Sequence, residues 1–289
     1  MRVIRADRML PSAYEEAVGP WDEVIELSYA PELVTGALRA LAHAATHWTL
    51  ISSVSVYARN DEPDADETAD LVEPNDLSRY PDAKVAAERA TANALGDRLF
   101  IARPGLIVGP GDPSDRFGYW MARLMRPGTV LIPTEAGRYV QIVDVDDLAD
   151  WLVRIGVDGA TGRANAVGPP HPFAEVLEQA RLATGFGGDF ITATDEELLA
   201  GDVAYWAGPR SLPLWLPAEY TGFARRRSDA FVSAGGTTRP LAMTVSRTLE
   251  AEVERGIDRP RRAGLTGVEE VDIVRQIVSR RHGLDTPSP

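Results

Sequence analysis

The sequence predicts an α/β fold built on a doubly wound parallel sheet, followed by a smaller mixed α/β lobe. Short apolar segments of strand length alternate along the chain with segments of helical periodicity, which is typical of a parallel sheet covered by helices. Each strand segment contains short apolar stretches, which favours strands buried in a parallel sheet. With 289 residues, 44% of them hydrophobic, the chain can bury a large core.

The first half of the chain contains most of the strands and helices that we predict for the parallel sheet and its cover. A helix from Pro31 is favoured because proline fits a first helical turn, and the helix before it should stop at Gly19. Strands are expected at 3–6, 22–28, 48–56, 99–108 and 164–168, with helices at 11–18, 31–43 and 81–94.

Beyond Gly109 the pattern changes. We expect a helix at 114–125, strands at 130–133 and 139–143, and a helix at 145–157 with Asp144 as its N-cap. From Pro172 onward the sequence is helical and irregular, and the tail 286–289 should be disordered. We therefore expect a sheet domain at 1–110 with a return segment at about 144–170, and a substrate lobe at 111–143 and 171–289.

A pair of residues at the start of one expected helix carries the strongest chemical signal. Tyr80 and Lys84 are four residues apart, so both side chains lie on one helix face. A lysine cation beside a phenol lowers the phenol pKa from about 10 and prepares it for acid/base work near neutral pH. Ser53, at the end of a buried strand, could hold a substrate oxygen beside that phenol. This combination predicts carbonyl or alcohol chemistry.

These motifs, in this order, resemble those of the extended short-chain dehydrogenase/reductase superfamily, the group of NAD-dependent epimerases, dehydratases and reductases. The similarity covers about residues 1–170 and includes the segment 103–112, into which the fourth expected strand runs, and the segment 140–149. It implies a Rossmann-like sheet and an acid/base role for Tyr80. It also implies that Lys84 lowers the pKa of Tyr80 and holds the nicotinamide ribose, with Ser53 on the substrate oxygen and Ser55 beside it.

The resemblance also implies contacts for other positions. The cofactor-binding residues it implies are Asp7, Leu27, Ser28, Lys84, Pro104, Gly105, Leu106 and Val108. In the turn at Leu27 and Ser28 the usual Asn/Ala-Gly is replaced by Ser28-Tyr29-Ala30, which departs from the family pattern. The substrate pocket would be lined by Ser55, Arg116, Tyr119, Trp120 and Gln141, for several of which core or surface packing is the alternative interpretation.

The Gly-rich phosphate loop of the superfamily, G-x-x-G-x-x-G, is missing from this sequence. Roughly fifty residues that the family places before Val3 have no counterpart, so two strands and the residue that selects NAD or NADP are not encoded here. We expect an N-terminally truncated sheet and impaired binding of either cofactor. Either the sequence is a fragment, or residues 3–6 have moved to pair with strand 22–28.

Charge and composition restrict the classes of partner that we expect the protein to bind. There are 43 acidic and 30 basic residues, and the net charge of −13 argues against nucleic acid. The chain has no cysteine, and its four histidines show no metal-ligand clustering, so no metal site is expected. No apolar leader or membrane-length segment occurs in the sequence, which favours a cytoplasmic protein. The resemblance implies a small-molecule substrate. The acidic run 61–76 is expected to be a solvated loop, with an active-site lid as the alternative.

Three hypotheses remain open from the sequence. The first is an NAD(P)-dependent epimerase, dehydratase or reductase acting on a nucleotide sugar or a smaller carbonyl compound. The second is a non-catalytic relic that serves as a binding or interaction protein, and the third is a cofactor-independent lyase or isomerase using Tyr80 and Lys84. The resemblance further implies a homodimer through helices 31–43 and 81–94.

Overall fold

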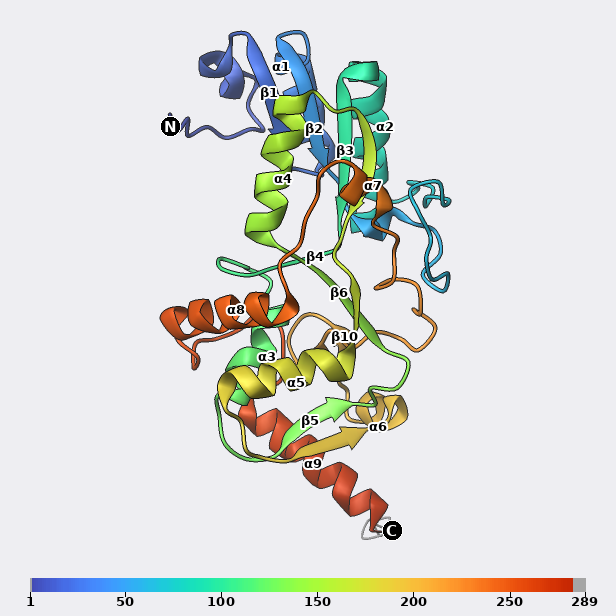
Figure 1. Cartoon of the computed structure of the whole chain (residues 1–289), viewed down its shortest axis with the longest axis vertical. Helices are drawn as coiled ribbons and strands as arrows, with labels where there is room; N and C mark the ends of the chain where they lie inside the picture. The colour runs from blue at the N-terminus through green and yellow to red at the C-terminus, as the bar shows by residue number, and fades with distance from the viewer. Residues whose placement is uncertain (1, 283–289) are drawn as a thin grey trace. The chain divides into compact units, whose positions relative to one another are not determined.

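The computed structural model describes residues 2–282, so the predicted tail at 286–289 lies outside the described residues (Figure 1). The chain divides into two compact units, each described here by itself. Unit 1 contains the chain up to Leu106 together with Gln141–Pro169 and Gly222–Thr238, whereas the sequence analysis assigned this last segment to the substrate lobe. Unit 2 contains Ile107–Val140, Pro170–Thr221 and the chain from Arg239 onward.

Unit 1 is built on a four-stranded parallel sheet. In the order of the sheet its strands are β1 (Trp21–Glu26), β2 (Ala45–Ile51), β3 (Leu99–Pro104) and β7 (Gly162–Ala166). Every adjacent pair is parallel, with Val24 opposite Trp48 and Leu50 opposite Ile101. The predicted parallel sheet is therefore confirmed.

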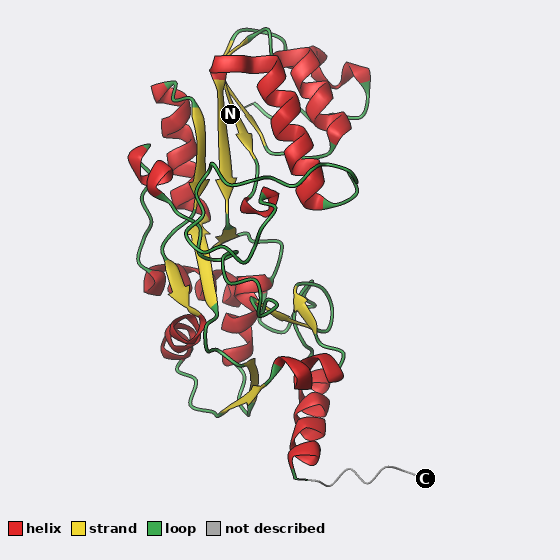
Figure 2. Ribbon diagram, turned by 90° about the vertical axis from the view of Figure 1, so that its right-hand side faces the viewer, coloured by secondary structure: helices red, strands yellow, loops and turns green. Residues whose placement is uncertain are grey.

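Helices cover both faces of this sheet, as Figure 2 shows. Helices α1 (Pro31–Leu41) and α2 (Tyr80–Leu95) pack on one face, where Trp48, Leu50 and Ile101 meet Ala37. Helix α4 (Val145–Asp158) packs on the other face, where Trp151 contacts Phe100 edge-on and also contacts Phe231 of α7 (Asp229–Ser233). Successive side chains of β2 and β3 thus point to opposite faces of the sheet, as the period of two in a strand requires.

Two predicted strands end earlier than expected. The strand predicted at 48–56 stops at Ile51, and Val54–Val56 forms a 3-10 turn (η2) whose N-cap is the Ser53 side chain. The strand predicted at 99–108 divides at Gly105 into β3 and β4 (Leu106–Val108). Helix α4 begins as predicted, with the Asp144 carboxylate accepting a hydrogen bond from the Asp146 amide.

The N-terminal segment differs from the prediction. Residues 3–6 form no strand, and the helix predicted at 11–18 is a 3-10 helix, η1 (Pro11–Ala17). Residues 3–6 have therefore not moved to pair with β1, and no strand among residues 2–282 pairs with its outer edge. The segment is fixed by side chains instead, since the Arg8 guanidinium binds both Glu26 and Tyr14.

Unit 2 is a mixed α/β unit, and it holds more short strands than the irregular pattern beyond Pro172 predicted. Its aromatic core includes Trp120, which contacts both Tyr119 and Phe173 edge-on. Within unit 2, β5 (Val130–Pro133) pairs with β9 (Phe190–Ala193), and β10 (Ala204–Trp206) pairs with β11 (Ser211–Pro213). The other strands are β6 (Tyr139–Asp144), which belongs to unit 1 from Gln141 onward, and β8 (Pro170–Pro172). Its helices are α3 (Arg116–Leu124), α5 (Phe173–Thr184), α6 (Asp195–Ala200), α8 (Leu241–Arg255) and α9 (Gly267–Arg281).

Candidate active site

Ser53 lies just past the carboxyl end of β2, in the turn that leads into η2. Its hydroxyl accepts a hydrogen bond from the Ser55 amide at 3.1 Å and donates to the Ser55 hydroxyl at 3.2 Å. The side chain is buried, and η2 packs against α2 through Val54, Val56 and Val85. The local hydrogen bonds fix the orientation of the Ser53 hydroxyl, while its convergence with Tyr80 stays a prediction.

Tyr80 and Lys84 occupy the first turns of α2, which starts at Tyr80 because Pro81 fits a first helical turn. The Lys84 ammonium lies 5.7 Å from the centre of the Tyr80 ring. It also donates a hydrogen bond of 2.6 Å to the carbonyl of Ile51, the last residue of β2. Lys84 is 3% exposed and the Tyr80 ring 41% exposed, so a buried cation lies under an accessible phenol.

The environment of Lys84 is electrostatically unusual. Burial lowers the pKa of its ammonium from 10.5 to about 8, and the carboxylates of Glu26 and Glu88 offset this effect only in part. Lys84 is also the single lysine among the 30 lysine and arginine residues of the chain. The chain therefore keeps one lysine, buried in the first turns of α2 beside Tyr80, and uses arginine everywhere else.

A third residue, Tyr29, belongs to this cluster and was missed as a site residue. It lies in the loop between β1 and α1, with its ring 4.9 Å from that of Tyr80 in an edge-on contact. The Lys84 ammonium lies 5.2 Å from the centre of the Tyr29 ring. The signal in the sequence was the departure of Ser28-Tyr29-Ala30 from the small residues of the family turn.

The residues around the end of β1 are organised by Glu26. Its buried carboxylate accepts hydrogen bonds from Arg8 and, at 2.7 Å, from the Ser28 amide. Leu27 is exposed, and exposed Asp7 accepts a hydrogen bond from the Met9 amide at 3.0 Å. The structure thus brings Ser28 next to the Lys84 cluster through Glu26. Dinucleotide contacts of Asp7, Leu27 and Ser28 stay predictions.

The segment after β3 packs closely against the residue that follows β7. Pro104 ends β3 in a buried position, and Leu106 and Val108 are buried in β4. A Cβ atom on Gly105 would lie 2.9 Å from Cγ1 of Val167, so this position needs glycine or a shift of its neighbour. The close approach fixes the course of the segment predicted to touch the nicotinamide end.

The predicted substrate-pocket residues fall in different units. Arg116, Tyr119 and Trp120 belong to α3 in unit 2, where the Arg116 guanidinium lies 4.8 Å from the centre of the Trp206 ring. Tyr119 and Trp120 are buried, and burial raises the pKa of Tyr119. Gln141 in unit 1 is also buried and makes hydrogen bonds to the backbone of Gly168 and Arg226, and Ser55 lies beside Ser53 in η2. Their contacts with a substrate stay predictions.

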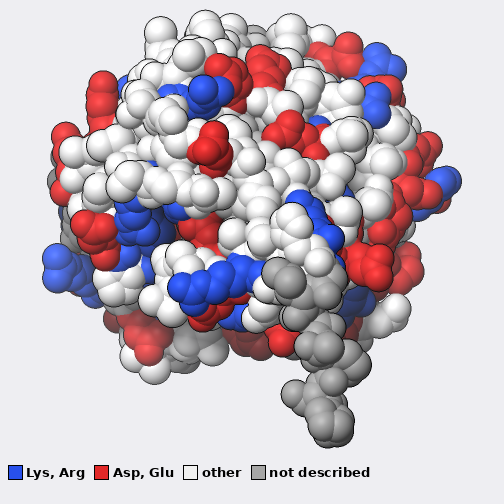
Figure 3. Space-filling model, turned by 90° about the horizontal axis from the view of Figure 1, so that it is seen from below, with Lys and Arg blue, Asp and Glu red and all other residues white. Residues whose placement is uncertain are grey.

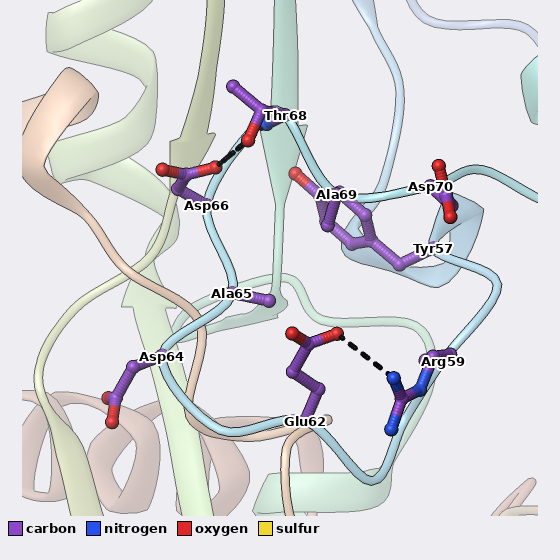
Figure 4. Close-up of a pocket in the computed structure, with 9 residues that line it drawn as sticks. All are labelled: Tyr57, Arg59, Glu62, Asp64, Ala65, Asp66, Thr68, Ala69 and Asp70. Atoms are coloured by element: carbon purple, nitrogen blue, oxygen red, sulfur yellow. Dashed lines mark hydrogen bonds and ion pairs between the residues drawn. The ribbon is translucent and has the colours of Figure 1, made fainter.

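The acidic run forms a cavity of about 440 Å³ within unit 1 (Figure 4). Its lining is Tyr57, Arg59, Glu62, Asp64, Ala65, Asp66, Thr68, Ala69 and Asp70. The loop is held by backbone hydrogen bonds from Gly222 and Phe223 to Asn60 and from Arg227 to Ala65. Inside the cavity, Asp66 accepts from Thr68 and Arg59 pairs with Glu62, so its charges are partly satisfied internally.

Three observations bear on what the protein could bind. Figure 3 shows basic and acidic side chains interspersed on the face it presents, without a continuous basic area there. Among residues 2–282, no helix is long and apolar enough to cross a membrane. Within the same residues, no group of three or more His, Asp or Glu side chains could hold a metal ion.

Comparison with known proteins identifies the family. Residues 6–168 match the model of the NAD dependent epimerase/dehydratase family. The chain belongs to this family. The match spans the whole Ser53, Tyr80 and Lys84 arrangement, in agreement with the extent of the resemblance in the sequence. No curated protein sequence matches the chain.

Solved structures share the fold. UDP-N-acetylglucosamine 4-epimerase from Bacillus cereus is similar with a TM-score of 0.66 at 12% identity, over 89% of this chain and 85% of that one. UDP-glucose 4-epimerase from Thermus thermophilus, in complex with NAD, gives 0.61 at 18% identity, over 86% and 83%. dTDP-4-dehydrorhamnose reductase from Bacillus anthracis, in complex with NADP, gives 0.59 at 15% identity, over 87% of each chain.

Proposed function

We propose that this protein is an epimerase, dehydratase or reductase in which Tyr80 exchanges a proton with an alcohol or carbonyl oxygen of the substrate. Lys84 supplies the positive charge that stabilises the phenolate form of Tyr80, and Ser53 holds the reacting oxygen. The supporting observation is the buried Lys84 ammonium, fixed on the Ile51 carbonyl and 5.7 Å from the Tyr80 ring.

The cofactor of the proposal is NAD or NADP, which supplies or accepts a hydride at the carbon next to that oxygen when it is bound. The residues present fit its nicotinamide end, because a buried cation lies next to an exposed tyrosine. Lys84 would hold the ribose there, and the backbone around Gly105 would line the ring. The sequence offers no Gly-rich turn for the phosphates.

We therefore propose that the 289-residue chain binds dinucleotides poorly. Each charge-assisted hydrogen bond to a phosphate contributes roughly 1.5–3 kcal/mol. The loss of two or three of them would weaken binding by about three orders of magnitude or more. A titration of the purified chain with NADH and NADPH, followed by energy transfer from tryptophan, measures this directly. Micromolar dissociation constants would contradict the proposed impairment.

The substrate class of the proposal is a nucleotide sugar, since the structural neighbours are named for UDP- and dTDP-sugars. The test incubates the chain and NADPH or NAD with UDP-glucose and with dTDP-4-dehydrorhamnose, and follows the sugar by NMR. Tyr80→Phe should reduce any turnover by about 10²–10⁴-fold, the usual contribution of a general acid/base. Tyr220→Phe, at an exposed position of unit 2, is the matched control. Turnover by Tyr80→Phe equal to that of the parent chain would overturn the role of Tyr80.

A non-catalytic binding protein is the second candidate, and one observation favours it. The Tyr29 and Tyr80 rings flank the Lys84 ammonium, which already bonds to the Ile51 carbonyl. This candidate predicts no turnover and no change in ligand binding on Tyr80→Phe. A cytoplasmic location and a homodimer through α1 and α2 also remain proposals, which fractionation of cells and light scattering would test.

A further inference from the structure

The loop between β1 and α1 places a large aromatic side chain over the one lysine of the chain. The Tyr29 ring is 5.2 Å from the Lys84 ammonium and meets the Tyr80 ring edge-on. Tyr29 is 45% exposed, whereas Lys84 beneath it is 3% exposed. The side chain that shields Lys84 is therefore itself at the surface.

The polar contacts of Lys84 explain why a ring lies there. An ammonium has three N–H donors, and one of them bonds to the Ile51 carbonyl. Aromatic faces attract a desolvated cation electrostatically, so the two tyrosine rings compensate part of the hydration that Lys84 loses. A polar ligand group could replace the Tyr29 ring and satisfy the same cation better.

We propose that Tyr29 is a gate over Lys84, closed in this structure, whose ring must leave before a ligand hydroxyl can reach the ammonium. Tyr29 acts through Lys84 and is therefore a positioning residue. The class of ligand, a ring bearing hydroxyl groups such as a ribose, rests on the proposed function. The gating of Lys84 does not rest on it, because access to the amine can be measured without any ligand.

The single lysine makes the test unambiguous. The full-length chain is treated with acetic acid N-hydroxysuccinimide ester, and mass spectrometry of the peptide containing Lys84 gives the acetylation rate. The rate is divided by the neutral fraction of the amine, taken from an NMR titration of the ¹⁵N-labelled lysine in each variant. Tyr29→Ala should react roughly tenfold faster or more, because a buried group reacts only when it is uncovered.

Two further variants of Tyr29 and one control separate loss of the aromatic ring from general loss of stability. Tyr29→Phe keeps the ring and should protect Lys84 as the parent does, whereas Tyr29→Leu should give an intermediate rate and serves if Tyr29→Ala fails to fold. Tyr220→Ala controls for loss of an aromatic side chain elsewhere. Unchanged acetylation in Tyr29→Ala and Tyr29→Leu, with cooperative melting retained, would overturn the gate.

Binding of reduced nicotinamide mononucleotide then tests the ligand class. This probe carries the ribose and lacks the adenylate half that a Gly-rich loop would help to hold. Tyr29→Ala should bind it several-fold more tightly than the parent chain. Faster acetylation without tighter binding would support the gate and count against the proposed function, so the two failures are distinguishable.

Discussion

Arg103 and Lys84 are two buried cations of unit 1 with opposite surroundings. The Arg103 guanidinium, 0% exposed, makes two parallel hydrogen bonds of 2.9 and 2.7 Å to Glu88 and a third of 3.1 Å to the Tyr57 hydroxyl. Burial alone would lower its pKa, but the bonds and charge of Glu88 prevail and raise it. Lys84 has one bond to a neutral carbonyl and two aromatic neighbours, and its pKa falls to about 8.

The difference is the one expected between a structural cation and the functional cation that we propose Lys84 to be. A buried ion pair with good geometry is compensated, and breaking it is strongly destabilising. A buried ammonium without a carboxylate partner is destabilising as it stands, and such groups gather at functional sites. The comparison therefore predicts that removing the two cations changes stability in opposite directions.

The largest expected effect is on Arg103. Arg103→Met leaves the Glu88 carboxylate buried and uncompensated, so the free energy of unfolding should fall by about 3–5 kcal/mol. Denaturant titration measures the loss, with Arg39→Met on the exposed side of α1 as control. The double variant Arg103→Met/Glu88→Leu should recover much of the loss. A decrease below about 1 kcal/mol would be the value of a surface pair and would contradict the structural assignment.

Lys84→Met should change the free energy of unfolding in the opposite direction. A pKa of about 8 against 10.5 unfolded means that keeping Lys84 charged costs about 3 kcal/mol near pH 7. Between pH 8 and 10.5 the unfolded chain binds the additional proton, so the stability of the parent rises with pH. Lys84→Met should therefore be more stable than the parent by about 1–3 kcal/mol at pH 7, and by less at pH 10. Chemical denaturation at both pH values checks this, and a large destabilisation at pH 7 would refute it.

Glu26→Gln should change stability least, and it tests whether nearby charge sets the pKa of Lys84. The Glu26 carboxylate raises the pKa of Lys84 through its charge, so its neutral isostere should lower that pKa further. Glutamine keeps an acceptor oxygen for the Ser28 amide, and the half-buried Arg8 can still reach water, so stability should change by only about 1 kcal/mol. Titration of the ¹⁵N-labelled lysine measures the shift, with Glu32→Gln in the first turn of α1 as control. An upward shift would show that charge does not govern this site.

The sequence predicted the sheet well because its strands are recognisable by local pattern. Strands β2 and β3 contain short apolar stretches, Leu50–Ile51 and Leu99–Ala102, and Pro31 and Pro81 mark the starts of α1 and α2. Residues 3–6 have the same pattern and form no strand. Local pattern does not show whether a segment pairs, and here the N-terminal segment is held through Arg8 on Glu26 and Tyr14, while no strand among residues 2–282 pairs with the outer edge of β1.

The candidate site was predicted only in part for a similar reason. Tyr80 and Lys84 share one helix, so their spacing fixes their proximity. Tyr29 reaches them from a loop far away in the sequence, and no periodicity encodes that contact. The pairing of Arg103 with Glu88 joins a strand to a helix, so the sequence alone does not show that this cation has a carboxylate partner.

The pKa of Lys84 tests the central claim most directly, because the claim is that this buried cation is unpaired and held for chemistry. Labelling with ¹⁵N-lysine gives one side-chain signal, since the chain has one lysine. The nitrogen chemical shift is then followed by NMR from pH 6 to 11 in the folded protein. The account predicts a midpoint near pH 8. A midpoint at the ordinary lysine value of 10.5 would contradict it.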